Sequence, residues 1–260
     1  MPATAPPAPP SRAATWCFAR YVRGLARRHF AAVHWNGARS AGASGQPVLF
    51  VANHTNWWDG FLAFLVGRRL GFVVHVLMDA ANLERYRMFR QVGALPLDRR
   101  SAGASYRDLD AAAAHLRRAG TGLWIFPQGA RRPAAAPLGG IGHGAAQLWL
   151  RSEGAPLIWP VAIRYAYLGE QLPEAFLWLG APRCPGGGNT VAAPAARRRL
   201  TAEIECRLAA GVAELDERLE REDLAGLSPL ESGRLSINKR LDRVRHSVGL
   251  LRGPFHPRNG

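Results

Sequence analysis

Between residues 45 and 222, short apolar runs alternate with longer segments in which apolar positions recur at helical spacing. The apolar runs have the length of buried strands, and the first of them, residues 47–52, reads PVLFVA. Strands and helices that alternate in this way build a sheet with helices on both faces. The pattern therefore predicts an α/β fold with a single sheet, mixed or mostly parallel. Strands are expected at 47–52, 72–77, 94–97, 122–126, 157–165 and 176–179, and helices at 59–69, 80–92, 104–119, 144–153 and 194–222.

The segment ahead of this region has a different pattern. Residues 1–14 are rich in proline and alanine and predict a disordered tail. Residues 15–36 predict a basic amphipathic helix, which suits either the surface of an anionic membrane, as an anchor, or packing against its own domain. Its apolar side carries Trp16, Phe18, Val22 and Leu25, and its basic side carries Arg20, Arg23, Arg27 and Arg28.

The boundaries of the α/β domain follow from changes in composition. A stretch of small residues and glycine at 37–45 predicts a linker, so the domain is expected to cover residues 45–222. The remaining residues, 223–260, predict a basic tail with interspersed apolar positions. Such a tail fits either a second contact with a membrane surface or an ordinary terminal helix.

The composition excludes wholesale disorder and indicates a polyanionic partner. The 260 residues are 48% hydrophobic and 20% charged, as a packed core requires. The formal net charge is +15, and nearly all 34 basic residues are arginine because Lys239 is the only lysine. A surface of this charge attracts either nucleic acid or an anionic membrane face.

Cysteine content and hydropathy narrow the setting further. The three cysteines, Cys17, Cys184 and Cys206, cannot form a disulfide framework, and no pair has metal-ligand spacing. We therefore expect a reducing compartment and no metal site. No apolar stretch reaches the roughly 20 residues that span a bilayer, since Arg68 and Arg69 interrupt the longest one. A protein that is neither secreted nor transmembrane, but can lie on a membrane, is expected.

The candidate chemistry follows directly after the first predicted strand. Residues 53–59 read NHTNWWD, which places His54 and Asp59 five residues apart. On one regular helix the two side chains would point about 140° apart. They can meet if His54 lies on the turn and Asp59 in the first helical turn. A carboxylate on one imidazole nitrogen leaves the other nitrogen as a proton acceptor, so the pair is a candidate general base for a hydroxyl.

Three further motifs follow in order along the chain. GALPLDR occupies residues 93–99, FPQGAR residues 126–131 and PVAI residues 160–163. Together with the NHxxxxD pattern, they resemble the four sequence blocks of the glycerophospholipid acyltransferase superfamily, of the lysophosphatidate acyltransferase type. The resemblance extends over residues 47–165.

The resemblance implies an O-acyltransferase in phospholipid or other glycerolipid synthesis. His54 would be the general base and Asp59 the partner that orients it. The acyl donor would be acyl-CoA or acyl-ACP as co-substrate, with no cofactor. Arg99 and Arg131 match positions that hold the acceptor, usually through its phosphate, for which guanidinium groups are suited. The remaining expected substrate-binding residues are Gln128 and Gly129, from the same block as Arg131.

The rest of the chain fits direct transfer of the acyl group. It contains no Gly-x-Ser-x-Gly motif, and no cysteine lies near His54, so no covalent nucleophile of the protein is evident. The hydroxyl of the substrate would then attack the thioester. Backbone N–H groups of the turn that carries His54 are candidate donors for the resulting oxyanion.

Two departures from the family pattern concern the acceptor. The third block usually reads Phe-Pro-Glu-Gly-Thr-Arg, whereas this chain has Gln128 in place of the glutamate and Ala130 in place of the threonine. A glutamine both donates and accepts hydrogen bonds, unlike a glutamate. The chain also lacks the lysine that often precedes the helix near Gly144. A different hydroxyl-bearing or amine-bearing lipid acceptor is therefore an alternative.

The expected partners are the thioester donor, which includes acyl carrier protein, the lipid acceptor and an anionic membrane surface. The expected location is cytoplasmic, peripheral or monotopic on the cytoplasmic face of the membrane. A basic nucleic-acid-binding protein is the alternative from another class, but no nucleic-acid-binding module is recognisable. A catalytically inactive scaffold is disfavoured by the intact pair of His54 and Asp59.

Overall fold

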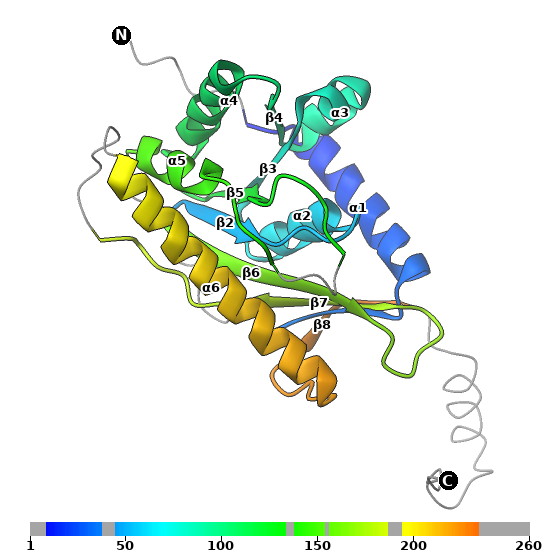
Figure 1. The fold of residues 1–260 in the computed structure, drawn as a ribbon. Coiled ribbons are helices and arrows are strands. Elements are labelled where there is room, and N and C mark those ends of the chain that lie inside the picture. Colours follow the sequence, from blue (N-terminus) through cyan, green and yellow to red (C-terminus); the bar gives the residue numbers. More distant parts are fainter. Residues whose placement is uncertain (1–8, 38–44, 134–137, 154–155, 187–193, 234–260) are drawn as a thin grey trace, which may run out of the picture.

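The computed structural model describes residues 9–37, 45–133, 138–153, 156–186 and 194–233 (Figure 1). These residues form one eight-stranded sheet in the order β4-β3-β5-β2-β6-β7-β1-β8. The five strands from β4 to β6 are parallel to their neighbours, and β7 is antiparallel to β6. The strands are β1 (Ala32–Trp35), β2 (Val48–Ala52), β3 (Val73–Asp79), β4 (Ala94–Leu97), β5 (Thr121–Ile125), β6 (Leu157–Ala166), β7 (Glu174–Leu179) and β8 (Ser228–Ser232).

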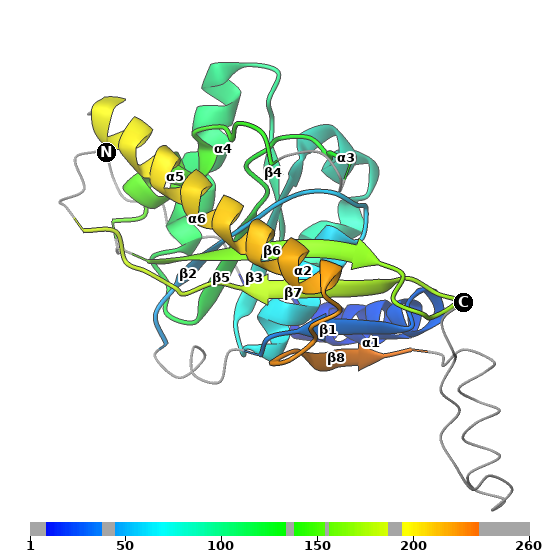
Figure 2. The same ribbon diagram turned by 60° about the horizontal axis from the view of Figure 1, so that its bottom comes forward.

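Helices cover both faces of the sheet, and α6 and α1 lie on opposite sides of it (Figure 2). Successive residues of β2 point to opposite faces, so Phe50 belongs to the core under α1 and α2, whereas Leu49 belongs to the core under α4, α5 and α6. All of β2 is buried, as expected for a central parallel strand. The helices are α1 (Arg12–His29), α2 (Asp59–Arg69), α3 (Ala80–Arg85), the 3-10 helix η2 (Arg87–Val92), α4 (Ala102–His115), α5 (Gly144–Arg151) and α6 (Pro194–Glu220).

The predicted fold class, a single mixed sheet flanked by helices with an N-terminal helix, is confirmed. The helix predicted at 59–69 and the strand predicted at 94–97 coincide with α2 and β4. The helix predicted at 80–92 is instead two short pieces, α3 and η2, separated at Tyr86. Gly93 ends η2 with a φ of 101°, a conformation that glycine adopts without strain.

The two ends of the sheet were not predicted. The helix expected at 15–36 ends at His29, and residues 32–35 form β1, which pairs with β7. Strand β8 lies within the segment expected to be a tail and pairs with β1. The sheet therefore extends beyond both limits of the domain expected at 45–222. Parts of the expected N-terminal tail, linker and C-terminal tail, at 1–8, 38–44 and 234–260, lie outside the described residues.

Helix α1 packs on its own domain. Its buried residues include Phe18, Val22 and Ala26, which join the core that α2 also covers. Arg23 and Arg27 both form ion pairs with Glu231 of β8, at 2.8 and 2.9 Å, and this carboxylate is only 7% exposed. The apolar side of α1 is thus buried against the rest of its own domain. In the part of the chain that the structure describes, no helix combines the length and apolarity needed to cross a bilayer.

Two buried histidines lie next to each other on the face covered by α4. His75 is on β3 and His115 ends α4, and their ring centroids are 4.1 Å apart. Burial, with a further contribution from His115, lowers the pKa of His75 from 6.5 to about 4. Burial and the nearby Arg118 lower the pKa of His115 to the same range, about 4. Both rings are therefore neutral in the folded protein at pH 7.

Candidate active site

The candidate site lies where parallel strands of the sheet end. His54 is on the turn that follows β2, and Asp59 is the first residue of α2. The FPQGAR motif follows β5, and Arg99 follows β4. Because β2, β4 and β5 run in the same direction, their carboxyl ends bring these motifs to one edge of the sheet. Open α/β sheets bind their ligands at this edge.

His54 and Asp59 are joined as the sequence predicted. The Nδ1 atom of His54 lies 2.7 Å from Oδ2 of Asp59. The Asp59 side chain is fully buried, whereas that of His54 is 24% exposed. The pair meets because His54 is on the turn while Asp59 is already helical, which is the arrangement that the five-residue spacing requires.

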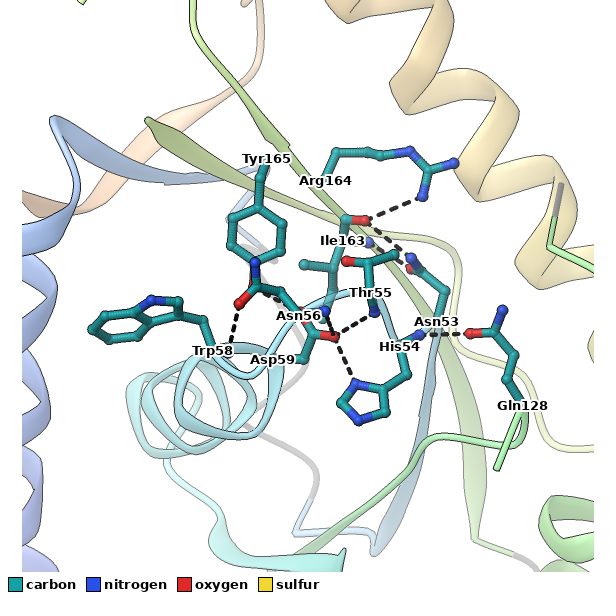
Figure 3. Close-up of polar contacts among 10 residues, drawn as sticks. All are labelled: Asn53, His54, Thr55, Asn56, Trp58, Asp59, Gln128, Ile163, Arg164 and Tyr165. Carbon is teal, nitrogen blue, oxygen red and sulfur yellow. Dashed lines mark hydrogen bonds and ion pairs between the residues drawn. The ribbon is translucent and has the colours of Figure 1, made fainter. Parts of the chain in front are cut away.

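The buried carboxylate of Asp59 has donors on every side (Figure 3). Its Oδ2 atom also accepts hydrogen bonds from the backbone N–H groups of Thr55 and Asn56, at 2.6 and 2.9 Å. Its Oδ1 atom accepts one from the phenol of Tyr165, at 2.6 Å. Asp59 also lies at the N-terminus of α2, where the helix dipole favours negative charge. A buried charge needs such partners, and this one has them.

This arrangement fixes the chemistry available to His54. A carboxylate can only accept a hydrogen bond, so the proton shared with Asp59 is on Nδ1 and the neutral ring presents a lone pair at Nε2. The ring stacks on Phe126 of the third motif, with centroids 4.6 Å apart, which restricts its rotation. A partly exposed imidazole held in this way can accept a proton from a bound hydroxyl.

Asn53 fixes the turn to the neighbouring strand. Its side chain is 1% exposed and forms two hydrogen bonds with the backbone of Ile163 on β6. The Nδ2 group donates to the Ile163 carbonyl at 3.0 Å, and Oδ1 accepts from the Ile163 N–H at 2.7 Å. The residue before His54 is thus held by β6, the strand that also carries Tyr165.

Gln128 connects the third motif to the turn that carries His54. Its Oε1 atom accepts the backbone N–H of His54 at 2.6 Å, and its Nε2 group donates to the carbonyl of Leu138 at 2.7 Å. Each end of the amide therefore has a partner within the protein. A glutamate here could accept from His54 but could not donate to Leu138. The contacts of Gln128 suit a brace between two loops, and its expected contact with the substrate stays a prediction.

The remaining expected substrate-binding residues lie on the same loop or next to it. Gly129 has a φ of 72°, and its carbonyl accepts a hydrogen bond from Arg99. Arg99 also lies 3.5 Å from the carboxylate of Asp79 and is about half exposed. Arg131 is exposed, and among the described residues it forms no ion pair. The two arginines therefore differ, because Arg99 is already engaged whereas the Arg131 guanidinium is available to an anion.

The backbone donors of the His54 turn are already used. The N–H of His54 bonds to Gln128, and those of Thr55 and Asn56 bond to Asp59. The N–H of Trp58 bonds to the side chain of Asn56 at 3.2 Å. The expectation that this turn supplies the oxyanion donors is therefore wrong for these groups, because the turn uses them to hold its own shape and to solvate Asp59.

Tyr165 is the residue of this cluster that sequence reasoning missed. It lies on β6, 106 residues after Asp59, just beyond the PVAI motif. Burial, followed by the charge of Asp59 and the hydrogen bond to it, raises the pKa of the Tyr165 phenol well above its usual value. The phenol therefore remains a donor at physiological pH.

Among the described residues, no three His, Cys, Asp or Glu side chains come together around a point where one ion could contact them all.

Comparisons with known proteins indicate the family and the fold of the chain. Residues 32–164 match the family model described as Acyltransferase. No curated protein matches the chain. Among solved structures, the chain is similar to the 1-acyl-sn-glycerophosphate (LPA) acyltransferase, PlsC, from Thermotoga maritima. The two are 19% identical over 77% of this chain and 81% of that one, with a TM-score of 0.51, a likeness that supports a shared fold.

Proposed function

The chain belongs to the acyltransferase family, and from this premise we propose that it transfers a fatty acyl group from acyl-CoA or acyl-ACP to a hydroxyl of a lysophospholipid or related glycerolipid. The observation that carries the proposal is the hydrogen bond between Nδ1 of His54 and the fully buried carboxylate of Asp59. This bond leaves Nε2 of a partly exposed ring as the proton acceptor at the carboxyl edge of the sheet.

In the proposed reaction, Nε2 of His54 accepts the proton of the acceptor hydroxyl as its oxygen attacks the thioester carbonyl. The tetrahedral intermediate then collapses, the C–S bond breaks, and the thiolate leaves and takes the proton from the imidazolium. Asp59 stabilises the imidazolium between these steps. Cys17, Cys184 and Cys206 are exposed and form no disulfide with one another, and none belongs to the His54 cluster. No acyl-enzyme intermediate is required.

Two arginines support an acceptor that bears a phosphate. Arg99 and Arg131 follow strands that end at the same edge of the sheet as β2, and guanidinium groups bind phosphate through paired hydrogen bonds. Arg131 is the better candidate, because Arg99 is engaged with Gly129 and Asp79. The acceptor that fits this arrangement has a hydroxyl within a few ångströms of an anionic headgroup, as a lysophospholipid has.

A hydroxyl-bearing or amine-bearing lipid of another kind is the second candidate. The observation that favours it is the Gln128 side chain, whose two ends are occupied by His54 and Leu138. A headgroup that needs a free hydrogen-bond acceptor at position 128, or a lysine near Gly144, has neither partner in this chain.

The experiment that separates these acceptors supplies purified protein with radiolabelled acyl-CoA or acyl-ACP and a panel of lipids. The panel pairs lysophosphatidate and lysophosphatidylglycerol with monoacylglycerol, which lacks phosphate, and with a lipid that has a primary amine. Labelled ester, which mild alkali cleaves, is expected on the lysophospholipids. Alkali-resistant amide on the amine-bearing lipid alone would replace the proposed acceptor with the second candidate.

We further propose that the enzyme binds the cytoplasmic face of an anionic membrane through an aromatic face. This face consists of the exposed side chains of Tyr21, Trp57, Tyr86 and Met88, which are between 45% and 59% exposed. Tyr21, Trp57 and Tyr86 contact Phe18, Phe61 and Phe89 respectively, through ring contacts of 4.5 to 6.4 Å, and Met88 directly precedes Phe89. Exposed aromatic and Met side chains grouped in this way are typical of contacts with a membrane interface.

The basic residues of α1 support the same proposed membrane contact. Arg12, Arg20 and Arg28 are exposed and, within the described part of the chain, form no ion pairs. Arg20 lies over the exposed ring of Trp16, with its guanidinium carbon 5.3 Å from the ring centroid. Basic residues beside apolar ones bind anionic headgroups. Since Trp57 belongs to the aromatic face and to the turn that carries His54, the proposed membrane contact adjoins the candidate active site.

Replacing Tyr21 and Met88 together with serine should lower the fraction of protein that floats with phosphatidylglycerol vesicles. The two side chains lose apolar area that would enter the interface, so we expect the partition coefficient to fall at least about fivefold. Point substitutions are used because α1 contributes to the core. Tyr167→Ser, at an exposed tyrosine outside the aromatic face, is the control and should float as the unchanged protein does. Equal flotation of all three proteins would remove the aromatic face from the membrane contact.

A further inference from the structure

We propose that Tyr165 is a positioning residue of the catalytic pair, acting through Asp59 on the proton-accepting strength of His54. The inference deepens the proposed acyltransferase function and rests on it. The residue lies immediately after residues 32–164, the part of the chain that matches the family model. It was identified by the structure alone, because 106 residues separate it from its partner.

Tyr165 and His54 bind different oxygens of the same carboxylate. The Tyr165 phenol donates to Oδ1 of Asp59 at 2.6 Å, whereas Nδ1 of His54 lies 2.7 Å from Oδ2 (Figure 3). A carboxylate with a donor on one oxygen only can rotate about its Cβ–Cγ bond. With Tyr165 on Oδ1, and with two backbone N–H groups beside His54 on Oδ2, rotation would break four hydrogen bonds at once. Tyr165 therefore helps to fix the plane of the carboxylate, and with it the direction of the hydrogen bond to the imidazole.

The phenol is held by aromatic packing as well as by its hydrogen bond. Its ring stacks on Phe30, with centroids 5.9 Å apart at an angle of 26°. Phe30 in turn packs edge-on against Trp58, with centroids 4.8 Å apart, and is 2% exposed. Phe30 follows the last residue of α1, and Trp58 precedes Asp59, so this contact connects the end of α1 to the start of α2. The Asp59 side chain is fully buried, so its bond to Tyr165 is shielded from water, and hydrogen bonds to a charged group are stronger in such surroundings.

The hydrogen bond from Tyr165 also tunes how firmly Asp59 holds the imidazolium. A donor on Oδ1 withdraws negative charge from Oδ2, so Asp59 stabilises a protonated His54 less than it would without Tyr165. Without the phenol, His54 would remain protonated to a higher pH and a smaller fraction would be active as a base. The buried Oδ1 atom of Asp59 would also lose its hydrogen bond from the phenol. Both effects lower kcat without altering any group that contacts the acceptor.

Tyr165→Phe tests the inference because it removes only the hydroxyl and keeps the ring stacked on Phe30. We expect kcat to fall about tenfold, the lower end of the effect expected when a hydrogen bond to a charged group is lost. KM for the acceptor should change by less than about twofold. A substitution raises KM when it removes a contact that binds the substrate, and the hydroxyl of Tyr165 contacts Asp59 instead. The acidic limb of the pH profile of kcat should move to higher pH. Tyr167→Phe, two residues along the chain at an exposed position, is the matched control and should behave as the unchanged enzyme.

A second readout does not depend on activity. The imidazole resonances of His54, assigned by their loss in His54→Ala, are followed by NMR from pH 4 to 9 in the unchanged protein and in Tyr165→Phe. Titration of His54 at a higher pH in Tyr165→Phe supports the inference. Identical titration curves would overturn it, even if kcat falls, because the loss would then be structural. An unchanged kcat and acidic limb in Tyr165→Phe would also overturn it. If the unchanged protein transfers no acyl group to any acceptor, the proposed function fails, and the NMR comparison still decides whether Tyr165 acts on His54.

Discussion

Replacing His54 with alanine should lower kcat for acyl transfer by about a hundred- to ten-thousand-fold, the contribution that general-base catalysis makes in enzymes. The reason is that the cluster around Asp59 serves to present one lone pair, that of Nε2 of His54. Among the described residues, no second histidine contacts Asp59 and could replace it. Product formation from labelled acyl thioester, measured with the best acceptor of the lipid panel, gives the effect directly.

The fold should survive this substitution. His54 contributes its backbone N–H to Gln128 and its carbonyl to the N–H of Arg132, and alanine keeps both. The circular dichroism spectrum and unfolding midpoint should therefore stay close to those of the unchanged protein. Tyr167→Phe, at an exposed tyrosine outside the His54 cluster, is the control and should retain full activity. Activity of His54→Ala within about threefold of the control would exclude His54 as the base.

The second large effect is a loss of stability in mild acid. His75 and His115, each 3% exposed, have pKa values of about 4 in the folded protein, against 6.5 for an unperturbed histidine. Between these values the unfolded chain binds more protons than the folded one, so the free energy of unfolding falls as the pH falls. The contribution is fully present above pH 6.5 and is lost progressively down to about pH 4. It amounts to about 3 kcal/mol for each histidine, since one pKa unit corresponds to 1.36 kcal/mol.

Urea unfolding at pH 7 and pH 4.5 measures this loss. In the double variant His75→Leu/His115→Leu, neither position titrates, so the difference in free energy of unfolding between the two pH values should be smaller by several kcal/mol. Comparison with the double variant is needed because carboxylates also contribute to acid unfolding. The exposed His29→Ala should show the full pH dependence of the unchanged protein. An equal loss of stability in the double variant would mean that the buried pair has no part in it.

The central part of the fold could be predicted from the sequence because its signals are local. Strand β2, the turn with His54 and helix α2 follow one another within about 20 residues, and each has its own pattern of apolar and polar positions. Strands β1 and β8 lack such patterns. They are four and five residues long, lie at one end of the sheet, and depend on pairing with each other and with β7. The amphipathic pattern of α1 continued into β1 and concealed it.

The same distinction holds at the candidate site. The His54–Asp59 pair could be predicted because both residues lie in one short motif. The contacts of Asp59 with Tyr165, of Asn53 with Ile163 and of Gln128 with Leu138 depend on which strands and loops become neighbours in the folded chain. The contacts of Gln128 could not be predicted for a related reason, since a motif gives the residue type but not the direction in which its amide points.

A single-turnover reaction tests the proposed direct transfer most closely. The enzyme, in excess over radiolabelled acyl thioester, is quenched at intervals with and without a lysophospholipid, and thiol, lipid ester and protein-bound label are each measured. The account predicts that thiol and labelled ester appear together, at equal rates and in equal amounts, only when the lipid is present, and that the protein carries no label. Release of thiol with label retained on the protein in the absence of lipid would contradict it, because the acyl group would then pass through a covalent intermediate.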